Sequence, residues 1–185
     1  MSRLISFIKA FLNLGRAIDT ADMYRKMGVK IGVNAKIQNE VMIDYSHYWH
    51  IEIGDNVTIA PRVHILAHDA STEKVVGLTK VANTSIGNNV FIGASSIILP
   101  GANIGDNVIV GAGSLVNKPL KSNGVYAGNP AKFITSIETY KEKIIKDLKL
   151  SKSFSEDYTL RKNISEKKKE VLYSQAKQHG KVYVK

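Results

Sequence analysis

Residues 86–116 read IGNNVFIGASSIILPGANIGDNVIVGAGSLV, and an isoleucine or valine returns at every sixth position of this segment. An earlier block of the chain has the same period. The next residue is usually glycine or alanine, and the fifth residue of each unit is usually small or β-branched. Twelve positions carry the period: Ile31, Ile37, Ile43, Ile53, Ile59, Ile65, Ile86, Ile92, Ile98, Ile104, Val110 and Val116. A fixed period of six over this length predicts a parallel β-helix.

The physical basis of this prediction is the small size of the repeating unit. Six residues make one short strand and one corner, which cannot bury their own apolar face. When the units stack, their aliphatic side chains form one central column and their backbones pair at roughly 4.8 Å. Polar pairs such as Asp55-Asn56 and Asn88-Asn89 suit tight corners. A β-sandwich is the alternative, but its alternating strands would not keep one period of six.

Three longer motifs are more specific than the period alone. They are IGDNVTIAPRVHILAHDAS (53–71), the segment 86–118 that ends in VNK, and VYAGNPAKFI (125–134). Together these motifs resemble the hexapeptide-repeat acyltransferases, and among them the sugar and polysaccharide O-acetyltransferases such as galactoside and maltose acetyltransferase. The resemblance covers about residues 29–134. It implies a left-handed β-helix with three hexapeptides per coil, acetyl-CoA as co-substrate and a homotrimer.

Composition excludes several classes of protein. A chain of 185 residues predicts one domain with appendages. The absence of cysteine excludes disulfides, thiolate nucleophiles and zinc–thiolate sites, and it suits a reducing compartment such as the cytoplasm. No apolar run reaches the roughly 18 residues of a membrane span.

The segment before the repeats, residues 1–28, predicts an amphipathic helix rather than a signal peptide, because no clear cleavage site follows it. Its apolar face would comprise Leu4, Ile8, Phe11 and Leu12. Such a helix could cover the open edge of the first coil. Alternatively, its basic residues could hold it at an anionic membrane surface as a peripheral contact.

The segment after the repeats, residues 135–185, differs in composition. It carries 13 basic and 7 acidic residues, hence +6, whereas residues 1–134 carry 13 and 9, hence +4. Helices are expected over Ser136–Leu150 and, more weakly, over Glu166–Gln178. The positive charge alone would suggest nucleic-acid binding, but acidic residues are interspersed and no binding motif accompanies them. The pattern favours a solvated helical surface and no nucleic-acid partner.

The period is interrupted twice, and interruptions can carry chemistry because a loop leaves the stack without disturbing the core. Residues 49–52 form a small insertion, and residues 69–85 form a long excursion. His68 lies at the mouth of the excursion. An imidazole can accept a proton from a hydroxyl near neutral pH. In the family that the chain resembles, the histidine here is the general base that activates the acceptor hydroxyl for direct attack on acetyl-CoA. The alternative is an ordinary polar corner residue.

The other histidines offer weaker alternatives. His64, four residues before His68, is a second candidate for the base. A metal site of His47, His50 and His64 is conceivable, but no carboxylate or thiolate pattern accompanies them. We therefore expect no metal. The fifth histidine lies in the C-terminal segment and is expected to be solvated.

A partner that orients His68 follows from the expected stacking. If three hexapeptides complete one coil, the Ile43 unit lies beneath the Ile65 unit. Asp44 and the nearby Ser46 then lie on the same side as His68, one coil away. A carboxylate there could accept a hydrogen bond from the imidazole and stabilise its charged form. Asp44 could instead be a corner residue or bind the acceptor sugar, and Asp69 is nearer to His68 in sequence.

Two aromatic residues, Tyr48 and Trp49, belong to the small insertion. Either ring could provide a flat apolar platform for one face of an acceptor sugar. Simple packing at a contact between subunits is an equally good interpretation, and the sequence does not distinguish the two.

The coenzyme surface is implied by the resemblance alone. In the family pattern, coenzyme A lies along coils that here contain FIGAS and VGAGSLVNK, and it ends near AGNPAK. Carried over by position, the binding residues are Ala94, Ala112, Asn117, Lys118 and Lys132. Small alanine side chains would let the pantetheine amides reach the backbone, and Lys132 would face phosphate. The family often has Thr at the position of Asn117 and Arg at that of Lys132.

These features predict an acetyl-CoA-dependent O-acetyltransferase that modifies a saccharide, such as a unit of a cell-surface polysaccharide or its precursor. N-acetylation of a nucleotide-linked amino sugar is the alternative enzyme function. Those relatives usually carry an additional N-terminal domain, and residues 1–30 are too few for one. A non-catalytic β-helix scaffold is the alternative outside enzymes, and it would need neither His68 nor the Asn117–Lys118 surface. The family's homotrimer predicts active sites between subunits.

Overall fold

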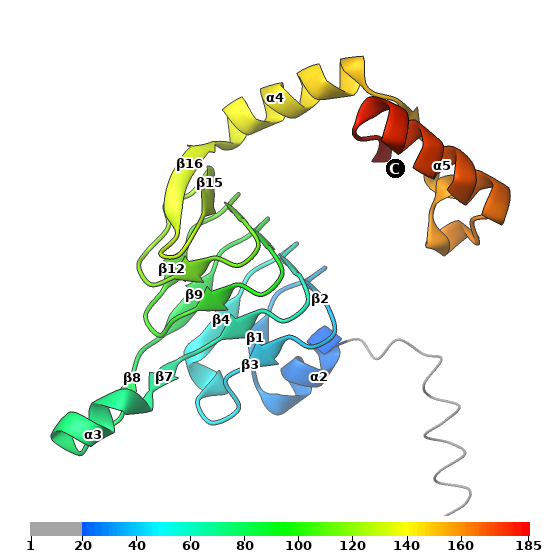
Figure 1. Ribbon diagram of the computed structural model, residues 1–185. Helices are drawn as coiled ribbons and strands as arrows, with labels where there is room; N and C mark the ends of the chain where they lie inside the picture. The colour runs from blue at the N-terminus through cyan, green and yellow to red at the C-terminus, as the bar shows by residue number, and fades with distance from the viewer. Residues whose placement is uncertain (1–19) are drawn as a thin grey trace, which may run out of the picture. The chain divides into compact units, whose positions relative to one another are not determined.

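The structure is a computed structural model that describes residues 20–185 (Figure 1). The chain divides into two compact units, Met1–Ile137 and Glu138–Lys185. The amphipathic helix expected around Leu4 to Leu12 lies outside the described residues. Over the described part of the chain, no helix is long and apolar enough to cross a membrane.

The first unit is a stack of coils whose strands form three sheets, with parallel pairing except for one terminal pair in sheet B. Sheet A contains β1 (Lys30–Ile31), β4 (Ile51–Ile53), β9 (Thr84–Ile86) and β12 (Asn103–Ile104). Sheet B contains β2 (Lys36–Ile37), β5 (Thr58–Ile59), β10 (Phe91–Ile92), β13 (Ile109–Val110), β15 (Gly124–Ala127) and β16 (Lys132–Ser136). Sheet C contains β3 (Met42–Ile43), β6 (His64–Ile65), β11 (Ile97–Ile98) and β14 (Leu115–Val116). Successive hexapeptides therefore enter sheets A, B and C in turn, which confirms three units per coil.

The periodic aliphatic residues form the core, as the sequence predicts. In sheet C, Ile43 pairs with Ile65 and Ile65 pairs with Ile98, so each residue lies on its equivalent in the next coil. Ile65 and Ile98 are completely buried. Burial of one such side chain contributes about 1.5–3 kcal/mol, and the column repeats this gain along the whole stack.

One corner of every coil is an asparagine in the left-handed backbone conformation. These residues are Asn34, Asn56, Asn89, Asn107 and Asn123, with φ between 55° and 61°. The side-chain nitrogen of each of the first four donates to the side-chain oxygen of the asparagine in the next coil, at 2.9 to 3.3 Å. Asparagine tolerates this conformation better than most residues, and the asparagine ladder satisfies its side chain as well.

The outward side chains differ between the three sheets. On sheet A they are polar: Lys30, Glu52, Ser85 and Asn103. On sheets B and C several exposed ones are apolar: Met42, Phe91 and Ile97. The β-helix thus has one polar sheet face and two faces with exposed apolar groups.

Additional elements cover the two ends of the stack. The helix α2 (Thr20–Met27) packs on β1 and β2, with Ala21 and Tyr24 buried (Figure 1). The Tyr24 hydroxyl donates to the Val41 carbonyl at 2.7 Å. At the other end, β16 pairs with β15 in an antiparallel hairpin, which the hexapeptide period did not predict.

Both interruptions of the period leave the stack. The small one contains the 3₁₀ turn η1 (Tyr48–His50). The long one contains β7 (His68–Asp69), η2 (Ala70–Thr72), α3 (Glu73–Val76) and β8 (Lys80–Val81), with β7 and β8 antiparallel (Figure 1). The expected loop is therefore a hairpin with a helical tip, and the chain rejoins sheet A at Thr84.

The second unit is mainly helical. It contains α4 (Ile137–Leu150), β17 (Ser153–Phe154), η3 (Glu156–Tyr158), η4 (Leu160–Lys162), α5 (Glu166–His179) and β18 (Tyr183–Val184). The strands β17 and β18 pair in parallel. Helices α4 and α5 occupy the two segments where the sequence predicts them, with bounds that differ by one residue.

Candidate active site

Asp44 is the buried polar group around which the candidate site is built. It follows β3, and its side chain is completely shielded from solvent. Oδ1 accepts from the Ser46 hydroxyl at 2.9 Å and from the Ser46 and His47 amides. Oδ2 accepts from the Ala67 amide at 3.0 Å and the His68 amide at 3.1 Å. The carboxylate therefore fixes two neighbouring coils to one another.

His68 donates its ring proton to this carboxylate. Its Nδ1 lies 2.5 Å from Oδ2 of Asp44, and its side chain is 28% exposed. Because a carboxylate only accepts, Nδ1 must carry the hydrogen, and in neutral imidazole Nε2 is then the free base. The structure thus brings together the predicted pair, Asp44 and His68. By contrast, the other carboxylate considered, Asp69, accepts from Ser71 at the start of η2.

Burial and hydrogen bonding act in opposite directions on the pKa of Asp44. Burial would raise the pKa, but hydrogen bonds from the Ala67 amide, the His68 ring and Ser46 outweigh it. The pKa of Asp44 therefore lies well below its usual range. The carboxylate thus remains an acceptor that holds the His68 ring in place.

A second histidine ring, His47, lies beside His68. The ring centroids are 4.9 Å apart, with an interplanar angle of 37°. His47 Nδ1 lies 3.0 Å from the Ser46 hydroxyl oxygen. That hydroxyl donates its one proton to Asp44. It therefore accepts a hydrogen bond from His47 Nδ1. This contact is not predicted by the sequence, because periodicity does not describe an insertion whose turn brings His47 back over Asp44.

The predicted aromatic platform divides into two different environments. Tyr48 packs against the core and lies close to Gly28. Trp49 remains 55% exposed, with its ring centroid 5.5 Å from that of His47. Of these two rings, only that of Trp49 is exposed beside the pair of histidines.

The remaining histidines lie elsewhere. His64 points outward from sheet C, between Met42 and Ile97 in register. His50 forms a hydrogen bond of 2.6 Å between Nδ1 and the Asn83 side-chain oxygen. His179 is exposed at the end of α5.

The described residues contain one group of side chains that could hold a metal ion: Asp44, His47 and His68, with candidate ligand atoms within 4.8 Å of one another. This group differs from the set of His47, His50 and His64 considered from the sequence. Both carboxylate oxygens of Asp44 already accept several hydrogen bonds, and a cation there would displace the proton that orients His68. The geometry suits a hydrogen-bonded base better than a metal centre.

The residues predicted to bind coenzyme lie at two different edges of sheet C. Ala94 and Ala112 stack at the corner before β11 and β14, where the Gly113 amide donates to the Ala94 carbonyl at 2.8 Å. Lys132 begins β16 above that edge and is exposed. Asn117 and Lys118 follow β14 at the opposite edge, which is also the edge where Asp44 and His68 follow β3 and β6. Within one chain, the two alanines and His68 therefore lie at opposite edges of sheet C.

Comparisons with known proteins agree with this architecture. The sequence profile of the bacterial transferase hexapeptide (six repeats) family matches residues 83–118. Protein CapG of Staphylococcus aureus is 41% identical over 168 residues, which cover 86% of this chain and 91% of CapG. Galactoside O-acetyltransferase of Escherichia coli K12 is 34% identical over 153 residues, covering 71% and 75%. A solved galactoside acetyltransferase in complex with coenzyme A superposes with a TM-score of 0.50 at 31% identity, over 65% of this chain and 71% of that one.

Proposed function

Because the chain belongs to the hexapeptide-repeat acetyltransferases, we propose that it transfers the acetyl group of acetyl-CoA to a hydroxyl of a saccharide, with His68 as the general base. The observation that carries this proposal is the hydrogen bond from His68 Nδ1 to the buried carboxylate of Asp44. That bond leaves Nε2 free to accept a proton. Membership in the family also implies that the coils wind left-handed.

The proposed reaction is a direct transfer. His68 Nε2 takes the proton of the acceptor hydroxyl while the oxygen attacks the thioester carbonyl carbon. The carbon–sulfur bond then breaks, and the leaving thiolate receives the proton from the imidazolium. Asp44 keeps the ring oriented and stabilises its positive charge during the transfer. The chain contains no cysteine, so the reaction involves no acyl-cysteine intermediate.

Two observations support a saccharide acceptor. Trp49 presents an exposed ring near His47 and His68, and an indole face can stack on a sugar ring. In addition, the related enzyme of Escherichia coli is named for a galactoside acceptor. An amino sugar is the alternative acceptor, and its amine would take the place of the hydroxyl.

The separation of the predicted coenzyme residues supports a homotrimer. Ala94 and Ala112 lie across sheet C from His68 in the same chain. If each groove forms between two subunits, the alanines of one chain can face His68 of the next. Lys118 and Lys132, which are both exposed, would then contact the phosphates as cations. The exposed apolar residues Met42, Phe91 and Ile97 would be covered in the same contacts.

The proposal is tested by measuring thiol release from acetyl-CoA with a panel of saccharides and amino sugars. We expect transfer to a saccharide hydroxyl, and a fall in kcat of at least about a hundredfold in His68→Ala, because a general base is lost. His64→Ala is the matched control, since His64 lies on the same strand as Ile65 and outside the cluster. Near-normal turnover in His68→Ala would exclude His68 as the base, and acetylated amine products alone would exclude the O-acetylation.

A further inference from the structure

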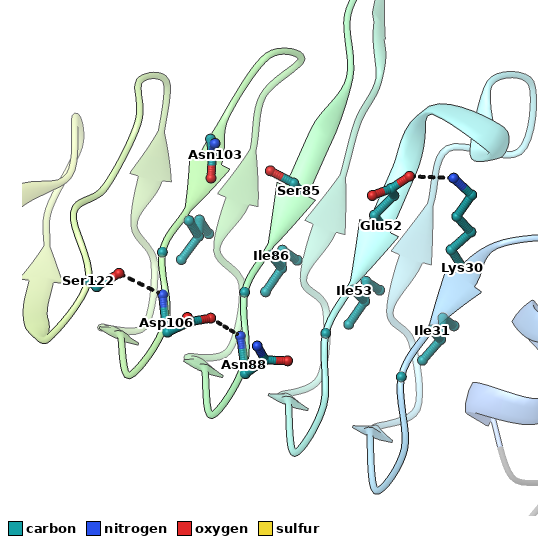
Figure 2. Close-up of a pocket in the computed structure, with 15 residues that line it drawn as sticks. Lys30, Ile31, Glu52, Ile53, Ser85, Ile86, Asn88, Asn103, Asp106 and Ser122 are labelled. Carbon is teal, nitrogen blue, oxygen red and sulfur yellow. Dashed lines mark hydrogen bonds and ion pairs between the residues drawn. The ribbon is translucent and has the colours of Figure 1, made fainter.

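We infer that the outer face of sheet A binds the acceptor as an extended, uncharged chain of several sugars, beyond the one sugar acetylated at His68. This inference rests on the proposed function, because it names the class of acceptor for that site. Figure 2 shows the groove in question, an open depression of about 700 Å³ that crosses the strands of sheet A.

The side chains along this groove form a row that crosses the strands. Lys30 pairs in register with Glu52, Glu52 with Ser85, and Ser85 with Asn103 (Figure 2). Neighbouring strands lie roughly 4.8 Å apart, which is close to the repeat of one hexose along an extended glycan. Each successive sugar would therefore meet a polar side chain of the next coil.

The chemistry of the row suits hydroxyl groups. An ammonium, a carboxylate, a hydroxyl and an amide supply both donors and acceptors. The ammonium of Lys30 is paired with Glu52 at 2.5 Å, so the two charges cancel. The groove therefore lacks the excess of positive charge that a polyanion such as a nucleic acid would need. Its outward side chains also lack the apolar surface that a second copy of the chain would bury.

The groove adjoins another depression beside the small insertion. A second depression of about 380 Å³ shares Lys30, Glu52 and Ser85 with the first and is also lined by Trp49 and His50. From Trp49 the ring contacts continue to His47, at 5.5 Å, and from His47 to His68, at 4.9 Å. Ring contacts thus link Trp49, in the wall of the second depression, with the base at His68.

The experiment measures binding to a printed array of defined glycans of one to six sugar units. The probe is the labelled full-length His68→Ala protein, so that retention does not depend on turnover. We expect retention to increase with chain length. Ser85→Arg, added to His68→Ala, should lower retention of the longest bound glycan by about tenfold, since it displaces one or two hydrogen bonds. Asn39→Arg is the matched control, because it adds the same charge at an exposed corner opposite sheet A.

Asn103→Ala serves as a second groove variant, should Ser85→Arg fail to fold as judged by thermal unfolding. Equal retention of single sugars and longer glycans, or equal effects of Ser85→Arg and Asn39→Arg, would overturn the inference. These outcomes differ from a failure of the proposed function. That failure would appear as absence of acetyl transfer to any saccharide, whatever its length.

Discussion

At the scale of single residues, Asp44 both stabilises the fold and orients the proposed base. Its carboxylate is shielded from solvent and accepts hydrogen bonds from two coils, including the one that orients His68. An unpaired carboxylate at such a position would be strongly unfavourable. The same hydrogen bonds that make burial of Asp44 possible also select the tautomer of the base.

Replacement of Asp44 by asparagine should make stability less dependent on pH. Because the folded pKa of Asp44 is depressed, its stabilisation is fully present above the ordinary pKa of about 4 and is lost progressively as pH falls from there towards the depressed folded pKa. We expect the free energy of unfolding of the wild-type protein to exceed that of Asp44→Asn by about 1.5–3 kcal/mol at pH 7. This difference should be smaller at pH 3. Denaturant unfolding at several pH values measures this. Asp55→Asn, at an exposed corner of the stack, is the control, and an unchanged difference at pH 3 would contradict the assignment.

At the scale of elements, each coil uses its neighbours to satisfy its own polar groups. The asparagine ladder illustrates this dependence. Asn89 accepts from Asn56 at 3.3 Å and donates to Asn107 at 3.1 Å, whereas Asn123 accepts from Asn107. A substitution within the ladder therefore removes contacts on two sides.

We predict that Asn89→Ala destabilises the protein more than Asn123→Ala. Both residues have positive φ, 56° and 61°, so the backbone penalty for alanine is similar. The inner position loses one further hydrogen bond of the ladder, and the difference should be about 0.5–1.5 kcal/mol. Paired unfolding experiments measure it. Equal losses would show that the ladder contributes no net stabilisation.

The sequence predicts the coils more completely than the site. Twelve aliphatic residues give the register directly, and that register correctly places Asp44 beside His68. It does not predict the path of the insertions, because these follow turn geometry and local hydrogen bonds. The contact of His47 with His68 and the packing of Tyr48 on the core were therefore not anticipated. Nor was the terminal β15–β16 hairpin, which lacks the period.

At the scale of the whole molecule, the first unit has two kinds of surface. Sheet A presents polar side chains, while sheets B and C expose Met42, Phe91 and Ile97. Burial of such apolar groups favours association, whereas the polar face remains available for a soluble ligand. The proposed trimer and the proposed glycan groove thus use different faces and do not compete for the same surface.

Mixing of two inactive variants tests the proposed sharing of the active site. His68→Ala lacks the base, and Ala112→Trp blocks the coenzyme surface. In a closed ring of three subunits, every mixed trimer has one groove with both parts intact. Since three quarters of randomly mixed trimers contain both variants, about one quarter of wild-type activity should return. Acetyl-CoA turnover after reversible dissociation measures it. Absence of activity despite proven subunit exchange, or a monomer by light scattering, would refute a shared site.

The excursion between sheets C and A returns to the stack close to where it leaves. The Ala82 amide donates to the Ala67 carbonyl at 2.9 Å, and the Thr84 hydroxyl donates to the Leu66 carbonyl at 2.8 Å. Hydrogen bonds hold both ends of the excursion to the stack. A longer or shorter excursion therefore changes mainly the entropy of loop closure, by about 0.6 kcal/mol for each doubling of length. Insertions at this point could therefore change the surface beside His68 while the coils retain the same stability.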